Sequence, residues 1–268
     1  MRIRIESTAL SVGLGLFVAV ATALAGSIGP AARGDDSAGP SSAPAVATGA
    51  AETVELIGAS LDAFRGQKGQ WQIVGDVRLD PADATRFVAV EGKGVATNGR
   101  EGRTVHLVSK LEHGDVEAHI EFVVPKGSNS GVYFQGRYEI QILDSWGVPA
   151  EKLKYGDCGG IYQRRGDQGG YEGHAPRENV SLPPGQWQSF DVVFRAPRFD
   201  ATGRKIANAK FLKVVHNGKL IHENVEVTGP TRAAMFNDEK PTGPLMLQGD
   251  HGPVAYRNLR IRAVKHPD

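Results

Sequence analysis

The sequence predicts an all-β protein, a sandwich of two antiparallel sheets. Apolar and polar residues alternate with a period of two in several segments, as expected of strands with one buried face. Roughly a dozen such segments occupy about 210 residues, which is typical of sandwiches and barrels. The chain of 268 residues also contains 34 Gly and 15 Pro, which favours frequent turns over long helices. Two stacked sheets of roughly six or seven strands each, one of them concave and open to a ligand, fit these observations best.

Short apolar runs bounded by turn residues predict most of the strands in chain order. They lie at residues 54–57, 86–90, 104–109, 130–135, 137–143, 159–163 and 244–249. The segment DVEAHIEFVV alternates most regularly, with Val116, Ala118, Ile120 and Phe122 on one face. Its polar residues lie on the other face, so the segment predicts a half-buried strand inside a sheet.

The second half of the chain continues the same pattern. WQSFDVVFR alternates regularly, and VAYRNLRIRAV alternates apart from Arg257. KFLKVVHNGKLIHENVEV predicts two strands joined at Asn217-Gly218, a dipeptide that suits the tight turn of a β-hairpin. Helical periodicity is nearly absent, and residues 149–153 and 232–237 each suit a single helical turn.

The N-terminal residues MRIRIESTALSVGLGLFVAVATALAG have the pattern of a secretory signal peptide. Two arginines precede an apolar run, and Ala23-Leu24-Ala25 forms a cleavage motif of small residues. We expect a signal peptide over residues 1–25, an Ala/Gly/Pro/Ser-rich flexible linker over 26–52 and a folded domain over 53–268. An uncleaved anchor is the alternative, but the apolar run is short for a span of about 20 residues. We therefore expect export to the periplasm or the extracellular space, without stable membrane insertion.

Charge and cysteine content restrict the partners of the chain. The formal net charge is +1 with both signs interspersed, so no basic field points to nucleic acid. The single cysteine, Cys158, has no partner for an intramolecular disulfide. Free cysteines are among the most buried residue types, so we expect a buried thiol rather than a nucleophile.

The stretch SNSGVYFQGRYEIQILDSWG, residues 128–147, places polar side chains in a strand pattern. A strand through Arg137 and Asp144 puts Glu139 and Gln141 on one face, about 7 Å apart. Asp144 has the opposite parity and reaches that face only through a bulge or at the strand end. A solvated sheet face is one interpretation, and a site that processes sugars is the other.

A second polar cluster lies in LMLQGDHGPVAYRN near the C-terminus. It contains Gln248, Asp250, His251, Arg257 and Asn258. A His beside carboxylates suits general acid–base catalysis, because its proton moves near neutral pH. An Arg beside it suits an oxyanion. A polar hairpin loop without catalytic function is the alternative interpretation of this cluster.

Five segments in order, SNSGVYFQGRYEIQILD, CGGIYQ, WQSFDVVFR, VVHNGKLI and LMLQGDHGPVAYRNLRI, resemble the 3-keto-disaccharide hydrolase family. Its members are described as 3-keto-glucoside 1,2-lyases and 3-keto-2-hydroxyglucal hydratases. The resemblance covers residues 53–265 and implies a concanavalin A-like jelly roll. The chain departs from the family at residues 186–189, Gln-Trp-Gln-Ser, where members commonly carry Trp-Asn. The loop 164–185 is also individual to this chain.

The resemblance implies an enzyme that removes the carbon-2 proton of a 3-keto-glycoside and eliminates the group on carbon 1. Hydration then gives net hydrolysis. Glu139 or His251 is expected as the base and the other as the acid, while Arg257 or a bound divalent cation stabilises the enolate. The metal ligands are not identified by any spacing in the sequence. Substrate contacts are expected from Asn129, Tyr138, Gln141, Asp144, Tyr162, Gln248 and Asn258.

Two other functions fit the same fold. A non-catalytic carbohydrate-binding module would need an exposed aromatic platform and dispensable carboxylates. A laminarinase-type glycoside hydrolase typically carries Glu-x-Asp-x-x-Glu on one strand, whereas this chain has Glu139-x-Gln141-x-x-Asp144. The density of titratable groups favours the 3-keto-glycoside enzyme over a binding module, and the amide of Gln141 breaks the laminarinase pattern.

Overall fold

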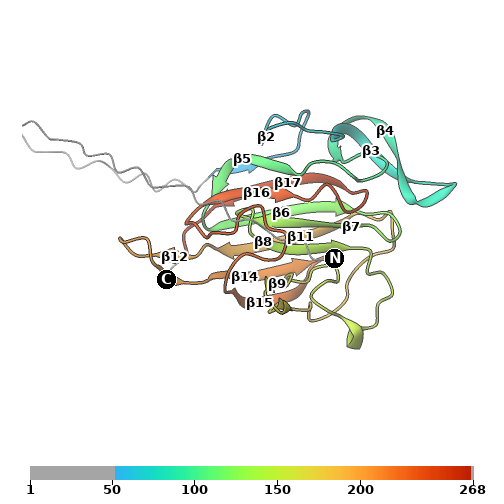
Figure 1. The fold of residues 1–268 in the computed structure, drawn as a ribbon. Helices are drawn as coiled ribbons and strands as arrows, with labels where there is room; N and C mark the ends of the chain where they lie inside the picture. Colours follow the sequence, from blue (N-terminus) through green and yellow to red (C-terminus); the bar gives the residue numbers. More distant parts are fainter. Residues whose placement is uncertain (1–51, 267–268) are drawn as a thin grey trace, which may run out of the picture. The chain divides into compact units, whose positions relative to one another are not determined.

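The computed structural model describes residues 52–266 and contains two main antiparallel sheets (Figure 1). The first has eight strands in the order β15-β14-β11-β6-β17-β4-β3, with β1 paired to β17. The second has five strands in the order β2-β5-β16-β7-β8. This arrangement confirms the predicted all-β, jelly-roll sandwich of two antiparallel sheets. The strands divide as eight and five rather than six or seven each.

The eight-stranded sheet consists of β1 (Thr53–Glu55), β3 (Gln72–Asp80), β4 (Asp83–Thr97), β6 (Val116–Val123), β11 (Gln188–Arg195), β14 (Ala209–His216), β15 (Lys219–Val227) and β17 (Ala255–Ala263). The five-stranded sheet consists of β2 (Phe64–Arg65), β5 (Leu107–His113), β7 (Asn129–Phe134), β8 (Tyr138–Leu143) and β16 (Gly243–Leu247). Two small hairpins and one 3₁₀ turn complete the set: β9 (Arg164–Gly166) with β10 (Gly169–Tyr171), β12 (Arg198–Phe199) with β13 (Lys205–Ala207), and η1 (Ala150–Lys152).

Strand β6 lies near the centre of the eight-stranded sheet, between β11 and β17. Its apolar residues are buried in alternation, as the sequence predicts. In β17 the alternation fails at Arg257 because the register shifts between Arg257 and Arg260. Asn258 there has φ +47°, a left-handed conformation typical of a residue in a bulge. The irregular apolar pattern in the sequence therefore corresponds to a bulge in the strand.

The main core lies between the two sheets and is rich in aromatic residues. Phe134 of β7 and Phe194 of β11 are fully buried, with ring centroids 5.3 Å apart. Phe211 of β14 packs against both rings at 5.5 and 5.2 Å. Such pairs add to the free energy gained by burying large apolar area. They hold the strand that carries part of the site against the opposite sheet.

Several local predictions can be compared directly with the structure. Asn217 and Gly218 have φ of +48° and +80° in the β14–β15 hairpin, which confirms the predicted tight turn. The turn at residues 149–153 is present as η1, whereas residues 232–237 form no helix. Residues 159–163 pair with β8 through the bridge at Ile161 but form no strand. Of the β3–β4 hairpin, the sequence patterns predict only residues 86–90, which lie within β4.

Cys158 is buried, as predicted, with 2% of its surface exposed. Burial raises the pKa of its thiol to about 12, so the residue is unsuited to nucleophilic catalysis. Within residues 52–266, no helix has the length and apolarity needed to cross a bilayer. The predicted signal peptide and nearly all of the linker lie outside the residues that the structure describes.

Candidate active site

A pocket of about 180 Å³ opens on the face of the five-stranded sheet turned away from the core. The neighbouring strands β7 and β8 form its floor, and the segments that follow β8, β15 and β16 form its rim. Nine residues line it: Asn129, Tyr133, Glu139, Gln141, Tyr162, Arg232, Ala233, Gln248 and His251. Six of these are residues that the sequence analysis expected at the site: Asn129, Glu139, Gln141, Tyr162, Gln248 and His251.

Glu139 lies on β8, on the face that the strand pattern predicts. Its neighbours Tyr138 and Ile140 point into the core, which leaves Glu139 on the pocket face. The side chain is 2% exposed. Gly131 on the adjacent strand leaves room for its carboxyl group, because a Cβ at Gly131 would lie 2.2 Å from Glu139 Oε1. The carboxyl group is therefore held in a space that a missing side chain provides.

Burial raises the pKa of Glu139 to about 8. The Tyr133 hydroxyl donates a hydrogen bond that opposes this rise, and the negative charge of Asp250 adds to it. Burial also raises the pKa of Tyr133 well above its usual value. The tyrosine therefore remains a protonated hydrogen-bond donor at neutral pH. A carboxyl group whose proton leaves near pH 8 is suited to proton transfer.

Three amide side chains, those of Asn129, Gln141 and Gln248, line the pocket together with Glu139. With its amide nitrogen turned toward the strand, Gln141 donates to Glu139 Oε1 at 3.1 Å and to the Ser130 carbonyl at 3.2 Å. The Gln248 amide nitrogen lies 3.5 Å from the Tyr133 hydroxyl. Its oxygen is buried and has no hydrogen-bond partner among residues 52–266. A buried acceptor without a partner is costly, so the Gln248 oxygen is prepared to accept a hydrogen bond from a ligand hydroxyl.

His251 lies at the exposed rim of the pocket, in the loop between β16 and β17. Its Nδ1 is 2.5 Å from Asp250 Oδ1, so the carboxylate orients the ring. The Asn98 side chain holds the loop by donating to the carbonyls of Gly249 and Gly252 at 3.1 and 2.9 Å. A buried amide thus fixes both ends of the segment that carries the histidine.

Tyr162, Arg232 and Ala233 complete the rim. The Tyr162 amide donates to the Glu139 carbonyl at 3.1 Å, so its segment covers the edge of β8. The Arg232 amide donates to the Gln163 carbonyl at 2.8 Å. Ala233 has φ +62°, a conformation that costs free energy in a residue other than glycine. This bend lies where the loop that follows β15 contributes to the pocket.

That loop, residues 228–242, is attached to the turn between β7 and β8. The Thr231 amide donates to the Arg137 carbonyl, and the Met235 amide donates to the Gly136 carbonyl, each at 2.9 Å. The Arg137 guanidinium binds Asp238 at 2.9 Å. A Cβ at Gly136 would lie 3.1 Å from a ring carbon of Phe236. The loop therefore packs closely on the hairpin that carries Glu139.

The structure does not bring Arg257 to the pocket. Arg257 lies on β17 in the eight-stranded sheet, where its Nε is 2.6 Å from Glu121 Oε2. Its guanidinium stacks over the Trp187 ring at 4.1 Å. Asn258 also binds Glu121, at 2.7 Å. Both residues follow Tyr256, which points into the core, and the bulge leaves them on the outer side of the sheet.

Tyr138 and Asp144 also lie away from the pocket. Tyr138 is fully buried, and its hydroxyl donates to Glu239 at 2.6 Å, which ties the loop that follows β15 to the core. Asp144 follows the end of β8 and accepts a hydrogen bond from the Gly127 amide at 2.8 Å. Asp144 does not share the strand face of Glu139 and Gln141, and its carboxylate stabilises a turn instead. The predicted sugar contacts of these two residues have no support in this geometry.

Sequence reasoning missed three lining residues. Tyr133 pairs directly with Glu139 across β7 and β8, and a tight turn at Gly136 would have indicated this register. Arg232 and Ala233 come from a loop far along the chain, and no short-range pattern marks them. The positive charge that the sequence analysis assigned to Arg257 is available in the pocket from Arg232.

The pocket does not have the donor set of a protein-held metal site. Among residues 52–266, no group of three or more His, Cys, Asp or Glu side chains is placed to hold a metal ion. The lining includes one carboxylate and one imidazole, Glu139 and His251. The other oxygen donors in the pocket are the amides of Asn129, Gln141 and Gln248, which bind hard cations mainly beside further carboxylates. The described residues therefore provide no cluster of charged ligands for the bound divalent cation that the sequence analysis considered.

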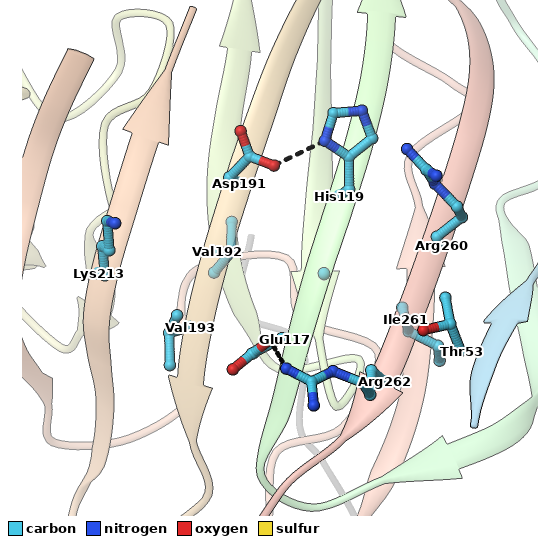
Figure 2. A pocket seen from close by; sticks show the side chains of 11 residues that line it. Thr53, Glu117, His119, Asp191, Val192, Val193, Lys213, Arg260, Ile261 and Arg262 are labelled. Atoms are coloured by element: carbon cyan, nitrogen blue, oxygen red, sulfur yellow. Dashed lines mark hydrogen bonds and ion pairs between the residues drawn. The ribbon is translucent and has the colours of Figure 1, made fainter. Parts of the chain in front are cut away.

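A second depression, of about 260 Å³, lies on the outer face of the eight-stranded sheet (Figure 2). Its charged groups largely pair with one another. His119 Nδ1 lies 2.6 Å from Asp191 Oδ1, and Arg262 binds Glu117. Lys213 and Arg260 lie at its edge. The two members of each pair lie on neighbouring strands and on the same exposed face of the sheet, as on an ordinary solvated sheet surface.

Several solved structures are similar to this chain, one of them with a TM-score above 0.5. A Parabacteroides distasonis ATCC 8503 protein described as a candidate glycosyl hydrolase has 25% identity and a TM-score of 0.57, covering 79% of this chain and 84% of that one. A second such protein from the same organism has 22% identity and a TM-score of 0.45, covering 72% and 99%. An endo-beta-1,4-glucuronan lyase from Trichoderma reesei has 11% identity and a TM-score of 0.40, covering 81% and 96%.

No curated protein matches the chain significantly. The sequence model of the 3-keto-alpha-glucoside-1,2-lyase-like domain, by contrast, matches residues 52–262. This match spans both sheets and every residue that lines the pocket. The chain is thus a carbohydrate-active enzyme of the hydrolase or lyase type, and it belongs to the family of 3-keto-alpha-glucoside-1,2-lyase-like domains.

Proposed function

We propose that the enzyme cleaves 3-keto-glycosides by elimination. The ketone on carbon 3 acidifies the proton on carbon 2, because the resulting carbanion delocalises onto the ketone oxygen. Removal of that proton gives an enolate, which expels the group on carbon 1 and forms a double bond between carbons 1 and 2. Addition of water across this bond then places hydroxide on carbon 1 and a proton on carbon 2, which gives net hydrolysis without redox change.

Glu139 is the base and His251 the acid in this proposal. Glu139 lies at the closed end of the pocket, and its pKa of about 8 makes it a stronger base than an ordinary carboxylate. His251 lies at the open rim, where the departing group must leave. Asp250 Oδ1, at 2.5 Å from His251 Nδ1, orients the imidazole, which donates a proton to the leaving oxygen in this proposal. Glu139 gains one proton in the first step, and His251 loses one in the second.

The other lining residues orient the sugar and stabilise charge. Arg232 supplies a guanidinium for the negative charge that develops on the ketone oxygen. The unpartnered oxygen of Gln248 accepts a hydrogen bond from a sugar hydroxyl, and Asn129 offers a further amide. Tyr133 donates to Glu139 and holds the carboxyl group in position.

One observation supports the proposal above all others. A buried Glu, with a raised pKa and room left by Gly131, lines the same amide-rich pocket as a His that is paired with an Asp. An ordinary glycosidase needs two carboxyl groups across the bond. Here Asp144, the second carboxylate near β8 in the sequence pattern, binds a turn outside the pocket. A single base with a nearby acid suits elimination.

A direct assay tests the function. Purified protein is incubated with a 3-keto-glucoside that carries a chromogenic leaving group, beside its unoxidised parent, with and without chelator. We expect release from the keto compound alone and no effect of the chelator. Release from the parent would indicate an ordinary glycosidase. Binding of sugar without release from either would indicate a carbohydrate-binding module.

We also propose that the enzyme is exported, on the evidence of the N-terminal pattern in residues 1–25. Cleavage after Ala25 would release the chain from the membrane during export. N-terminal sequencing of the protein recovered from the producing cells tests this. A mature chain that begins at Gly26 supports the proposal, and an intact Met1 in the cytoplasmic fraction contradicts it.

A further inference from the structure

A groove of about 420 Å³ adjoins the pocket, and His251 lines both. The two cavities also meet at neighbouring residues on β7 and its preceding turn, where Asn129 lines the pocket and Ser128 the groove. At about 180 Å³, the pocket is smaller than cavities that enclose drug-sized ligands. It has room for the reacting ring, so the rest of a glycoside must lie outside it.

The groove is rich in positive charge. Arg86, Arg100, Arg103 and Lys126 line it, with Glu101 as the one carboxylate among its lining residues. A surface of one sign draws ligands of the opposite sign and raises their local concentration. The formal net charge of the whole chain is only +1, so this concentration of cations is local.

These cations are only partly neutralised. Arg86 lies 3.2 Å from Asp83 and 3.4 Å from Glu101, and Arg100 lies 2.9 Å from Asp80. All three pairs are at least partly exposed to solvent, so they offset the charges of Arg86 and Arg100 but leave both guanidinium groups accessible to a ligand. Within residues 52–266, the Lys126 ammonium has no carboxylate within ion-pair distance.

The fourth cation, Arg103, donates to the backbone carbonyl of Asp250 at 2.7 Å. A carbonyl does not neutralise its charge, so the guanidinium remains a positive group beside the groove. The same contact links the groove to the loop that carries His251. Positive charge therefore begins at the residue that we propose as the acid and extends away from the reacting ring.

We propose that this groove binds a carboxylate on the leaving half of the substrate, the group attached to carbon 1. The inference rests on the proposed function, because it uses His251 as the acid that meets the leaving oxygen. A leaving group that departs past His251 enters the groove directly. Arginine and lysine side chains there match a uronate or another carboxylate-bearing aglycone.

The test compares two 3-keto-glucosides, one with a 4-carboxyphenyl and one with a 4-carboxamidophenyl leaving group, which have similar shape but differ in charge. A 4-sulfophenyl compound separates a carboxylate preference from a general anion preference. The quantity measured is the ratio of kcat/KM for the carboxylate to that for the carboxamide, at low and high salt. Comparing this ratio between variants cancels the intrinsic difference between the leaving groups.

The groove variant is Arg100→Gln/Lys126→Gln. Its matched control is Arg260→Gln/Lys213→Gln, which removes the same charges from the far sheet face (Figure 2). We expect the ratio to fall about tenfold in the groove variant, to remain unchanged in the control, and to fall with salt in the wild type. If the corresponding ratio for the sulfophenyl compound falls equally in the groove variant, the groove binds anions in general. That result would overturn the assignment to a carboxylate. An unchanged ratio in the groove variant would overturn the proposal.

A failure of the proposed function would look different. In that case neither keto compound is cleaved, and equilibrium binding of the unoxidised 4-carboxyphenyl and 4-carboxamidophenyl glucosides is measured by calorimetry. Tighter binding of the carboxylate, lost in the groove variant alone, would still support an anion-binding groove. Equal binding of the two glucosides by the wild type would remove the groove proposal as well.

Discussion

Tyr133 and Glu139 are direct partners across the β7–β8 ladder, and their side chains meet in the same pocket. The phenol donates to the carboxyl group, and burial keeps that phenol protonated. The pairing couples the basicity of Glu139 to one hydrogen bond. The position and strength of the proposed base are therefore set by strand register and by the polar groups around it.

The first prediction separates the base from the acid. In His251→Ala, a 3-keto-glucoside with a 2,4-dinitrophenyl leaving group needs no acid, so only the titration of Glu139 remains. We expect kcat/KM to rise with pH to a plateau, with a midpoint near 8, because ionised Glu139 is the active form. With poorer leaving groups the same variant should lose activity by about 100-fold. A profile that falls above pH 8 would make Glu139 the acid.

The second prediction concerns Tyr133→Phe. Loss of the phenol removes a hydrogen bond that lowers the pKa of Glu139. The midpoint of the pH profile should therefore move to higher pH. The measurement is made in the His251→Ala background, so that one titration is observed. An unshifted midpoint would show that this hydrogen bond does not control the carboxyl group.

The third prediction is that Glu139 lowers the stability of the enzyme at alkaline pH. Its folded pKa of about 8 lies above the usual value of 4.5, so the folded state binds more protons between these values. The contribution of Glu139 to folding stability is therefore complete below pH 4.5 and is lost as the pH rises toward 8. Glu139→Gln removes this loss, with a gain in unfolding free energy of roughly 4 kcal/mol at pH 8 and little change at pH 4. Urea unfolding at both pH values measures it, and equal pH dependence of the two proteins would contradict it.

The fourth prediction uses Gly131→Ala. A Cβ there would lie 2.2 Å from Glu139 Oε1, so the carboxyl group must move. The backbone of Gly131 is not in the left-handed region, and an alanine fits its strand conformation. We expect a folded enzyme that has lost about 100-fold in kcat/KM. Gly58→Ala is the matched control, since nothing lies within 4 Å of a Cβ there. Full activity in Gly131→Ala would show that the carboxyl position is not critical.

The fifth prediction compares the two arginines. Arg232→Gln should lower kcat by about 100-fold, because Arg232 provides the positive charge at the pocket. Arg257→Gln should keep its activity within about twofold and lose on the order of 1 kcal/mol of stability, from the Glu121 pair and the Trp187 contact. Steady-state kinetics and thermal unfolding measure both. The reverse order of effects would return the catalytic role to Arg257.

The fold was accessible from sequence because it depends on local patterns. Alternation in β6 and the Asn217-Gly218 turn follow from burial of one strand face and from backbone conformation. The same logic placed Glu139 and Gln141 together on one face of β8. These features require no knowledge of the neighbouring strands.

The residues of the site could be predicted only in part from the sequence, because the site also depends on contacts between distant segments. Arg257 follows Gln248 and His251 closely in sequence, yet the chain passes from the five-stranded to the eight-stranded sheet between them. Sequence proximity therefore suggested a shared site that the change of sheet prevents. Arg232 shows the reverse case, since a distant loop reaches the pocket through hydrogen bonds to the β7–β8 turn. Long-range contacts of this kind leave no periodic signal.

The attachment of the loop that follows β15 to the β7–β8 turn has a consequence for protein engineering. Thr231 and Met235 dock on Arg137 and Gly136 through backbone groups, and Asp238 binds the Arg137 side chain. Residues 129–143 and 228–240 are thus joined by backbone hydrogen bonds and an ion pair. Chimeras that exchange both segments with a relative should keep a working pocket, whereas those that exchange one should separate Arg232 from Glu139.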